Sequence, residues 1–438
     1  MRTGLLAAAA ALAGAAGAAR AEGADELTLC WAAWDPANAL VELSKDFEGQ
    51  SGHAMTFEFV PWTNYTDRML NELNAGGDLC DLLIGDSQWI GGGAENGHYV
   101  QLNEFFDANG ITMDDFAPAA VEAYSAWPKG TTNYYALPAM GDANGWFYRA
   151  DWFARPELQE AFQAEYGRPL AEPTSQTELL DIAKFFQGRE IDGTTVYGAS
   201  IFTERGSEGI TMGVTGALYA FGFQYETTPG SYDMEGAINS PEAIAGLEFY
   251  KELYDCCTPP GYTDAYMEES LDAFKSGQVA MAMNWFAFFP GLAADPTVGG
   301  ENIGFFVNPA QNQPGSTLGG QGISVVSYSD NQEAALEYIK WFAQPEVQQR
   351  WWELGGYPVH NAVLNDPGFA DSQPFAGDFL QAMGGVRDFW QEPAYADLLL
   401  AAQKRFHDYV VADQGTAEEA LNALKDDWTE IFEDEGRL

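Results

Sequence analysis

The chain has 438 residues, a formal net charge of −45, 46% hydrophobic residues and 14% aromatic residues. This composition is typical of a folded globular protein, and the length predicts two or three lobes rather than one core. Nucleic acid is excluded as a partner because the sequence has no basic stripe to neutralise phosphates. The acidic residues are spread along the chain, which favours a solvated acidic surface over the alternative of a cation-binding protein.

The first 21 residues indicate export. A basic start at Arg2 precedes an Ala/Leu/Gly run over residues 5–19, and Ala19 and Ala21 are small residues at the two positions that a signal peptidase reads. The run is too short to span a membrane, and no later segment supplies a span. We therefore expect a signal peptide over 1–21 and a soluble protein in the periplasm. Removal of Arg2 and Arg20 with the signal takes the charge from −45 to −47.

The chain then alternates strand and helix signals. Short apolar strands are predicted over 27–31, 55–60 and 81–85. The first intervening helix is predicted to have Asp35 as its N-cap and Pro36 as its first residue and to end at Gly49, and the second ends at Gly76. This order predicts a parallel sheet with right-handed crossovers.

The loops beyond these strands are rich in tryptophan and polar side chains. Ligands of such sheets bind beyond the carboxyl ends of the strands. An indole face beside amides and carboxylates suits a sugar ring, whose C–H face stacks while its hydroxyls need donors and acceptors. The alternative is that the tryptophans cap the sheet as core residues. The residues concerned are Trp34 and Asp35, then Trp62, Asn64 and Tyr65, and then Asp86, Gln88 and Trp89.

The second half of the chain continues the pattern. Helices are predicted around 181–186, 241–254 and 271–276, followed by an apolar strand over 279–285 that ends in Asn284 and Trp285. Residues 308–322 are rich in Gly, Pro and Asn and are interpreted as a crossing between lobes. A strand over 323–327 and a helix over 334–342 follow, and Thr416 with Glu419 predicts a capping box on the last helix.

The cysteines and histidines show no pattern typical of a metal site or a catalytic site. The cysteines are too few for a disulfide framework, and the adjacent Cys256 and Cys257 form either a vicinal disulfide or two buried thiols. None of the four histidines is spaced as a helical metal pair, and the sequence lacks G-x-S-x-G, Walker A and H-E-x-x-H motifs. We therefore expect no metal, no cofactor and no enzyme, although 65 acidic residues leave a glycosidase-like carboxylate pair open.

Several segments in order resemble the family 1 extracellular solute-binding proteins, the periplasmic components of sugar-type ABC importers, which include maltodextrin-binding proteins. The resemblance covers essentially the whole mature chain. Its segments are the loop at Trp34 and Asp35, the Gly-Asp-Leu-Cys-Asp-Leu sequence at 77–82, Tyr-Ala-Leu-Pro at 135–138 with 145–149, 277–285, 319–324, 335–352, and Gly-Tyr-Pro at 356–358.

The resemblance implies an α/β fold of two lobes, with mostly parallel sheets flanked by helices and a hinge between the lobes. The N-terminal lobe would comprise 22–139 and 318–355, and the C-terminal lobe 140–317 and 356–438. The protein would be a monomer that delivers its ligand to inner-membrane ABC permease subunits. Together with Trp89 from the strand-end argument, the implied ligand-binding residues are Trp34, Asp35, Asn64, Tyr65, Asp86, Gln88, Asp142, Asn144, Asn284, Trp285, Gly320, Gln321 and Tyr357.

Three functions follow from these observations. The leading hypothesis is a periplasmic binding protein for a neutral sugar, oligosaccharide or polyol. The second keeps the fold but binds a cationic solute such as a polyamine or quaternary amine, because aromatic walls beside Asp35, Asp86 and Asp142 also suit a cation. The third is an exported carbohydrate-active enzyme.

Overall fold

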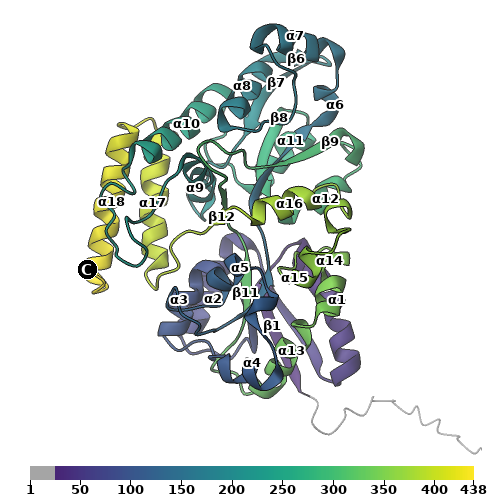
Figure 1. The fold of residues 1–438 in the computed structure, drawn as a ribbon, viewed down its shortest axis with the longest axis vertical. Coiled ribbons are helices and arrows are strands. Elements are labelled where there is room, and N and C mark those ends of the chain that lie inside the picture. Colours follow the sequence, from purple (N-terminus) through teal and green to yellow (C-terminus); the bar gives the residue numbers. More distant parts are fainter. Residues whose placement is uncertain (1–24) are drawn as a thin grey trace, which may run out of the picture.

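The computed structural model describes residues 25–438, so the predicted signal peptide lies outside the described residues. Two five-stranded sheets, each flanked by helices, form two lobes that lie one above the other in Figure 1. The predicted two-lobe α/β fold is confirmed.

The first sheet contains the three strands predicted nearest the N-terminus. Its strand order is β2-β1-β3-β11-β4, and β1 pairs in parallel with both β2 and β3, as predicted. Every residue of β3 is buried, which explains its uninterrupted apolar sequence. The strands are β1 (Glu26–Ala32), β2 (Ala54–Val60), β3 (Leu82–Asp86), β4 (Leu137–Met140) and β11 (Gln321–Val325).

The second sheet has the order β6-β7-β8-β5-β9. Only β7 and β8 pair in parallel here, whereas β5 runs antiparallel to both β8 and β9. The sheets are thus mixed rather than mostly parallel, because the strands β5 and β11, which enter a lobe from a crossing, join it antiparallel. The strands are β5 (Asn144–Arg149), β6 (Arg189–Ile191), β7 (Thr194–Ser200), β8 (Val279–Trp285) and β9 (Ile303–Val307).

The first helix shows how local sequence sets element boundaries. Helix α1 (Asp35–Ser51) has Trp34 as its N-cap, so it begins one residue before the predicted start. It continues through Gly49 and ends at Gly52, which adopts the left-handed conformation (φ 82°) that a helix C-cap requires. The predicted end at Gly49 is therefore wrong.

The other helices cover the sheets. Those of the lower lobe in Figure 1 are α2 (Trp62–Asn74), α3 (Ile90–Glu95), α4 (Asn103–Asn109), α5 (Pro118–Tyr124), α13 (Gln332–Phe342), α14 (Pro345–Glu353) and α15 (Asn361–Leu364). The upper lobe has α6 (Ala150–Phe153), α7 (Pro156–Tyr166), α8 (Gln176–Phe186), α9 (Gly209–Phe221), α10 (Pro241–Cys257), α11 (Met267–Lys275), α12 (Phe289–Ala293) and α16 (Ala376–Met383). Helices α17 (Tyr395–Val410) and α18 (Ala417–Asp434) pack beside α9 and α10, and α18 begins with the predicted capping box.

The chain crosses between the lobes at adjacent places. Residues 141–143 connect β4 to β5, and 308–320 connect β9 to β11 through the short β10 (Ser316–Thr317), which pairs with β12 (Val386–Arg387). The amide of Gly141 donates to the carbonyl of Tyr357 at 2.7 Å, and that of Gly319 to the carbonyl of Asp142 at 3.1 Å. The crossings therefore form one hydrogen-bonded bundle. The domain boundaries given above stay a prediction.

No helix within residues 25–438 is long and apolar enough to cross a membrane.

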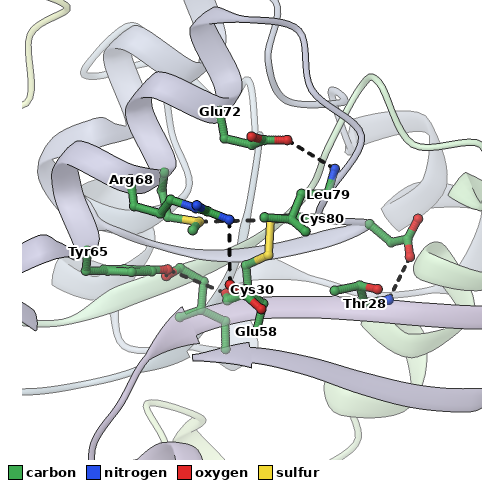
Figure 2. Close-up of a disulfide and its surroundings, with 11 residues drawn as sticks. Thr28, Cys30, Glu58, Tyr65, Arg68, Glu72, Leu79 and Cys80 are labelled. Carbon is green, nitrogen blue, oxygen red and sulfur yellow. Dashed lines mark hydrogen bonds and ion pairs between the residues drawn. A yellow bond between two sulfur atoms is a disulfide. The ribbon is translucent and has the colours of Figure 1, made fainter. Parts of the chain in front are cut away.

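All four cysteines are paired, so the expectation that no disulfide framework exists is wrong. Cys30 of β1 bonds Cys80, which lies just before β3 (Figure 2). The Cα atoms of the two cysteines are 5.7 Å apart, a distance that a disulfide spans. Cys256 and Cys257 form the vicinal disulfide, one of the two alternatives left open by the sequence.

Replacing Cys30 and Cys80 together by alanine should lower the free energy of unfolding by about 2–4 kcal/mol. The bond joins residues 50 apart, and losing it frees that loop in the unfolded chain. Urea denaturation followed by circular dichroism measures the change. Cys256→Ala with Cys257→Ala is the control, because neighbouring residues close no loop. Equal destabilisation by both pairs would contradict the loop argument.

Candidate functional site

A narrow cavity lies where the two lobes face each other. The lower lobe contributes residues beyond the carboxyl ends of β1, β2 and β3, and the upper lobe contributes residues beyond β7 and β8, with the crossings closing the remainder. The lining residues are Trp34, Trp62, Asp86, Gln88, Asp142, Glu208, Met212, Met267, Trp285, Leu318 and Gly319.

Three indole rings form the apolar walls. The rings of Trp34 and Trp62 lie 5.5 Å apart between centroids at 31° to each other. The Trp285 ring comes from the opposite lobe and donates through Nε1 to the Tyr266 hydroxyl at 3.2 Å. A Cβ atom at Gly319 would lie 2.6 Å from the Trp285 ring, so glycine is needed there for the ring to occupy this position. The cavity thus has flat apolar faces from both lobes.

One carboxylate joins the lobes across the cavity. Glu208, just before α9, accepts hydrogen bonds at Oε1 from Nε1 of Trp62 at 3.0 Å and from the Tyr266 hydroxyl at 2.8 Å. Trp62 begins α2 of the lower lobe, whereas Tyr266 precedes α11 of the upper lobe. The described structure therefore has its lobes in direct contact at Glu208.

Further acidic side chains surround the same space. Asp86 caps the short 3-10 helix that follows β3, where its Oδ1 accepts from the amide of Gln88 at 3.3 Å. The Gln88 side chain donates to Asp388 at 3.2 Å. Asp142 is buried in the first crossing and accepts from the amides of Ala143 (2.8 Å) and Ala287 (3.2 Å).

Burial and mutual repulsion shift the pKa values of these carboxyls. Burial, followed by the charges of Glu208 and Asp388, raises the pKa of Asp86 well above its usual value. Burial also raises the pKa of Glu208 to about 7, against the opposing hydrogen bonds from Tyr266 and Trp62. For Asp142, burial outweighs its backbone hydrogen bonds and again raises the pKa. The closed cavity thus favours protonated acids, and groups with such perturbed pKa values are typical of functional sites.

The cavity brings together only some of the residues predicted from sequence. Five of the fourteen predicted side chains line it, from both lobes and a crossing: Trp34, Asp86, Gln88, Asp142 and Trp285. The other nine lie elsewhere: Asp35, Asn64, Tyr65, Trp89, Asn144, Asn284, Gly320, Gln321 and Tyr357.

Four of these nine use their side chains in hydrogen bonds with backbone groups. Asn144 accepts from the amide of Thr317 and donates to the carbonyl of Met212, so both ends of its amide are used internally. Asn284 likewise bonds two backbone groups. The hydroxyls of Tyr65 and Tyr357 donate to backbone carbonyls.

The remainder have other surroundings. Trp89 packs on Tyr65, with ring centroids 5.3 Å apart, and Gln321 accepts from the indole of Trp31. A Cβ atom at Gly320 would overlap the Tyr124 side chain. Asp35 and Asn64 are exposed.

Five lining residues were not among the sequence candidates: Glu208, Met212, Met267, Leu318 and Gly319. Trp62 was named from its strand end but was not included in the predicted ligand-binding set. The rule that ligands bind beyond the carboxyl ends of parallel strands also applies to β7 and β8, which pair in parallel. Glu208 lies in the loop after β7, and Trp285 lies at the end of β8. Applying the strand-end rule to the second sheet would have found Glu208.

Among residues 25–438, no group of three or more His, Cys, Asp or Glu side chains is arranged to hold a metal ion. The acidic cavity is thus distinct from a preformed metal site.

Comparisons with known proteins agree on one family and one fold. The family model described as "Bacterial extracellular solute-binding protein" matches residues 33–349. Three solved structures with TM-scores of 0.76–0.77 cover 93–94% of this chain and 99–100% of their own, at 21–22% identity. They are the maltose-bound MalE3 of T. maritima, a solute-binding protein of Agrobacterium radiobacter K84 in complex with ribitol, and one of Thermotoga Lettingae TMO bound with alpha-D-tagatose.

Glu208→Gln should stabilise the protein at pH 8 by on the order of 2 kcal/mol and have little effect at pH 4. The folded state keeps the Glu208 proton up to about pH 7, whereas an unfolded glutamate loses it near 4.3, so wild-type stability falls as pH rises between these values. Glutamine stays neutral and still accepts from Trp62 and Tyr266. Melting temperatures of both proteins at the two pH values test this. Glu248→Gln, exposed on α10, is the control for the charge change. A pH-independent difference between Glu208→Gln and wild type would contradict the titration argument.

Proposed function

Because the chain belongs to the family of bacterial extracellular solute-binding proteins, we propose that it captures a sugar, oligosaccharide or polyol between its lobes and delivers it to an ABC permease. The observation that carries this proposal is the cavity between the lobes, with three indole faces beside carboxylate and amide groups. Indoles stack on the C–H face of a sugar ring, and carboxylates accept hydrogen bonds from its hydroxyls.

The lining residues also restrict the ligand. Neither lysine nor arginine occurs among them, which disfavours sugar phosphates and uronic acids because a buried anion needs a partner. Solved structures of the same fold contain maltose, ribitol and alpha-D-tagatose, ligands of this chemical class.

A hinge motion that opens and closes the two lobes would let a ligand enter the cavity. The crossings at 141–143 and 308–320 are joined by a hydrogen bond, and rotation about a few residues there would separate the lobes. Opening would break the bond between Trp62 and Glu208 and would expose the cavity to solvent. We therefore infer that the empty protein samples an open form, and that ligand holds it closed.

The remaining parts of the proposal concern place and partners. The family is extracellular, which supports a periplasmic protein that meets its permease at the membrane surface. We further propose that the protein acts as a monomer and binds without turnover. Incubation with nitrophenyl glycosides and measurement of released nitrophenol tests the latter, and steady release would favour the exported enzyme instead.

The test of the binding function is a thermal-shift screen of sugars and polyols, followed by titration of tryptophan variants. A ligand that binds only the folded form raises its melting temperature. We expect Trp34→Ala and Trp285→Ala each to weaken binding by about 1–3 kcal/mol, which is the cost of losing a buried aromatic face. Trp89→Ala is the matched control, because Trp89 packs on Tyr65 outside the cavity.

Trp89→Ala should lower stability but leave the dissociation constant unchanged. If Trp34→Ala and Trp285→Ala retain wild-type affinity, the cavity is not the binding site. If no sugar or polyol raises the melting temperature, the proposed ligand class is wrong.

A further inference from the structure

Acidic side chains from both lobes gather at the cavity. Asp86 and Glu208 line it from opposite lobes, and Asp388 adjoins it through its hydrogen bond with Gln88. Asp86 and Glu208 are each only 7% exposed. Burying carboxylates together is costly unless a cation or protons compensate for the charge.

Asp86 and Glu208 have no cationic partner within residues 25–438. Within residues 25–438, none of the ion pairs includes Asp86, Glu208 or Asp388. Lys129 is the basic group that acts on Asp388, yet its ammonium donates to the carbonyls of Glu122 and Ala123. The other titratable groups that act on Asp86 and Glu208 or are influenced by them are acids and phenols: Glu204, Tyr65, Tyr99, Tyr124, Tyr266 and Tyr395.

Unpartnered polar atoms in the walls show what else a ligand must offer. Gln88 is 2% exposed, and its Oε1 has no hydrogen-bond partner within the described residues, so it needs a donor. Nε1 of Trp34 is also buried without a partner and needs an acceptor. An ammonium group can satisfy Gln88 and the carboxylates but never Trp34, whereas a hydroxyl oxygen can accept from Trp34.

The walls themselves favour a positive charge. Trp34, Trp62 and Trp285 present indole faces, which attract an ammonium group electrostatically, most strongly where water is excluded. Carboxylates, an amide oxygen and indole faces in one cavity thus all favour a ligand with a positive charge.

We propose that the ligand carries a positively charged amine beside its hydroxyls, as amino sugars and amino-substituted polyols do; this inference rests on the proposed sugar or polyol site. The amine lies between Asp86 and Glu208, and its charge replaces the protons that the empty cavity retains. The hydroxyls occupy the remaining polar groups, including Nε1 of Trp34.

Matched ligands test this by titration calorimetry at pH 7. Glucosamine, galactosamine and mannosamine are compared with glucose, galactose and mannose, and glucamine with sorbitol. The N-acetylated amino sugars keep the substituent but lack the charge. Maltose, ribitol, tagatose, choline and putrescine complete the set. We expect at least one amine to bind about tenfold or more tightly than its parent and its N-acetyl form.

Variants locate the effect. Glu208→Gln and Asp86→Asn should each remove most of the preference for the amine over its parent. Glu248→Gln, which makes the same charge change on the exposed face of α10, should leave the preference intact. Melting curves confirm that each variant is folded before titration.

The outcomes separate this inference from the proposed function. Parent sugars or polyols that bind as tightly as their amines, or more tightly, overturn the inference and leave the proposed function standing. An amine preference that survives in both Glu208→Gln and Asp86→Asn also overturns it. Binding of choline or putrescine alone, or of no compound at all, overturns the proposed function and the inference with it.

Discussion

The contact on which the closed structure depends is the pair of hydrogen bonds that Glu208 accepts from Trp62 and Tyr266. A single carboxylate thereby ties helix α2 of one lobe to the loop before α11 of the other. Because Glu208 is buried beside Asp86, this contact is made against electrostatic repulsion. The closed form is therefore held by directional hydrogen bonds and aromatic packing, and it is weakened by the charge of its own site.

This arrangement is physically sensible for a protein that must release what it binds. Burial of these acids lowers the stability of the folded protein as rising pH removes their protons, and binding sites commonly carry such a cost. The hinge bundle is built differently, from backbone hydrogen bonds between the crossings and from the buried Asp142, whose carboxylate accepts two amides. Because the crossings are held by backbone hydrogen bonds and the cavity contains buried acids, the lobes can separate while the hinge stays folded.

The sequence predicted what depends on local pattern. The strand order near the N-terminus, β8 and the capping box at Thr416 follow from apolar runs and turn residues, and the structure confirms them. Trp34 and Trp285, which the strand-end rule named, line the cavity, and their role in binding stays a prediction. The other errors have physical causes. Asn144 is polar and lies at a strand end, but the crossing strands use both ends of its amide. The Cys30–Cys80 pairing depends on how the loop before β3 folds against β1, which composition does not reveal.

Small-angle X-ray scattering tests the central claim, that two lobes close on a solute, most directly. The protein is measured empty and then saturated with a sugar or polyol that raises its melting temperature. We predict a smaller radius of gyration in the saturated sample, because ligand shifts the population toward the form in which Trp62 and Glu208 are bonded. An unchanged radius at saturation would show a rigid pocket and contradict the account.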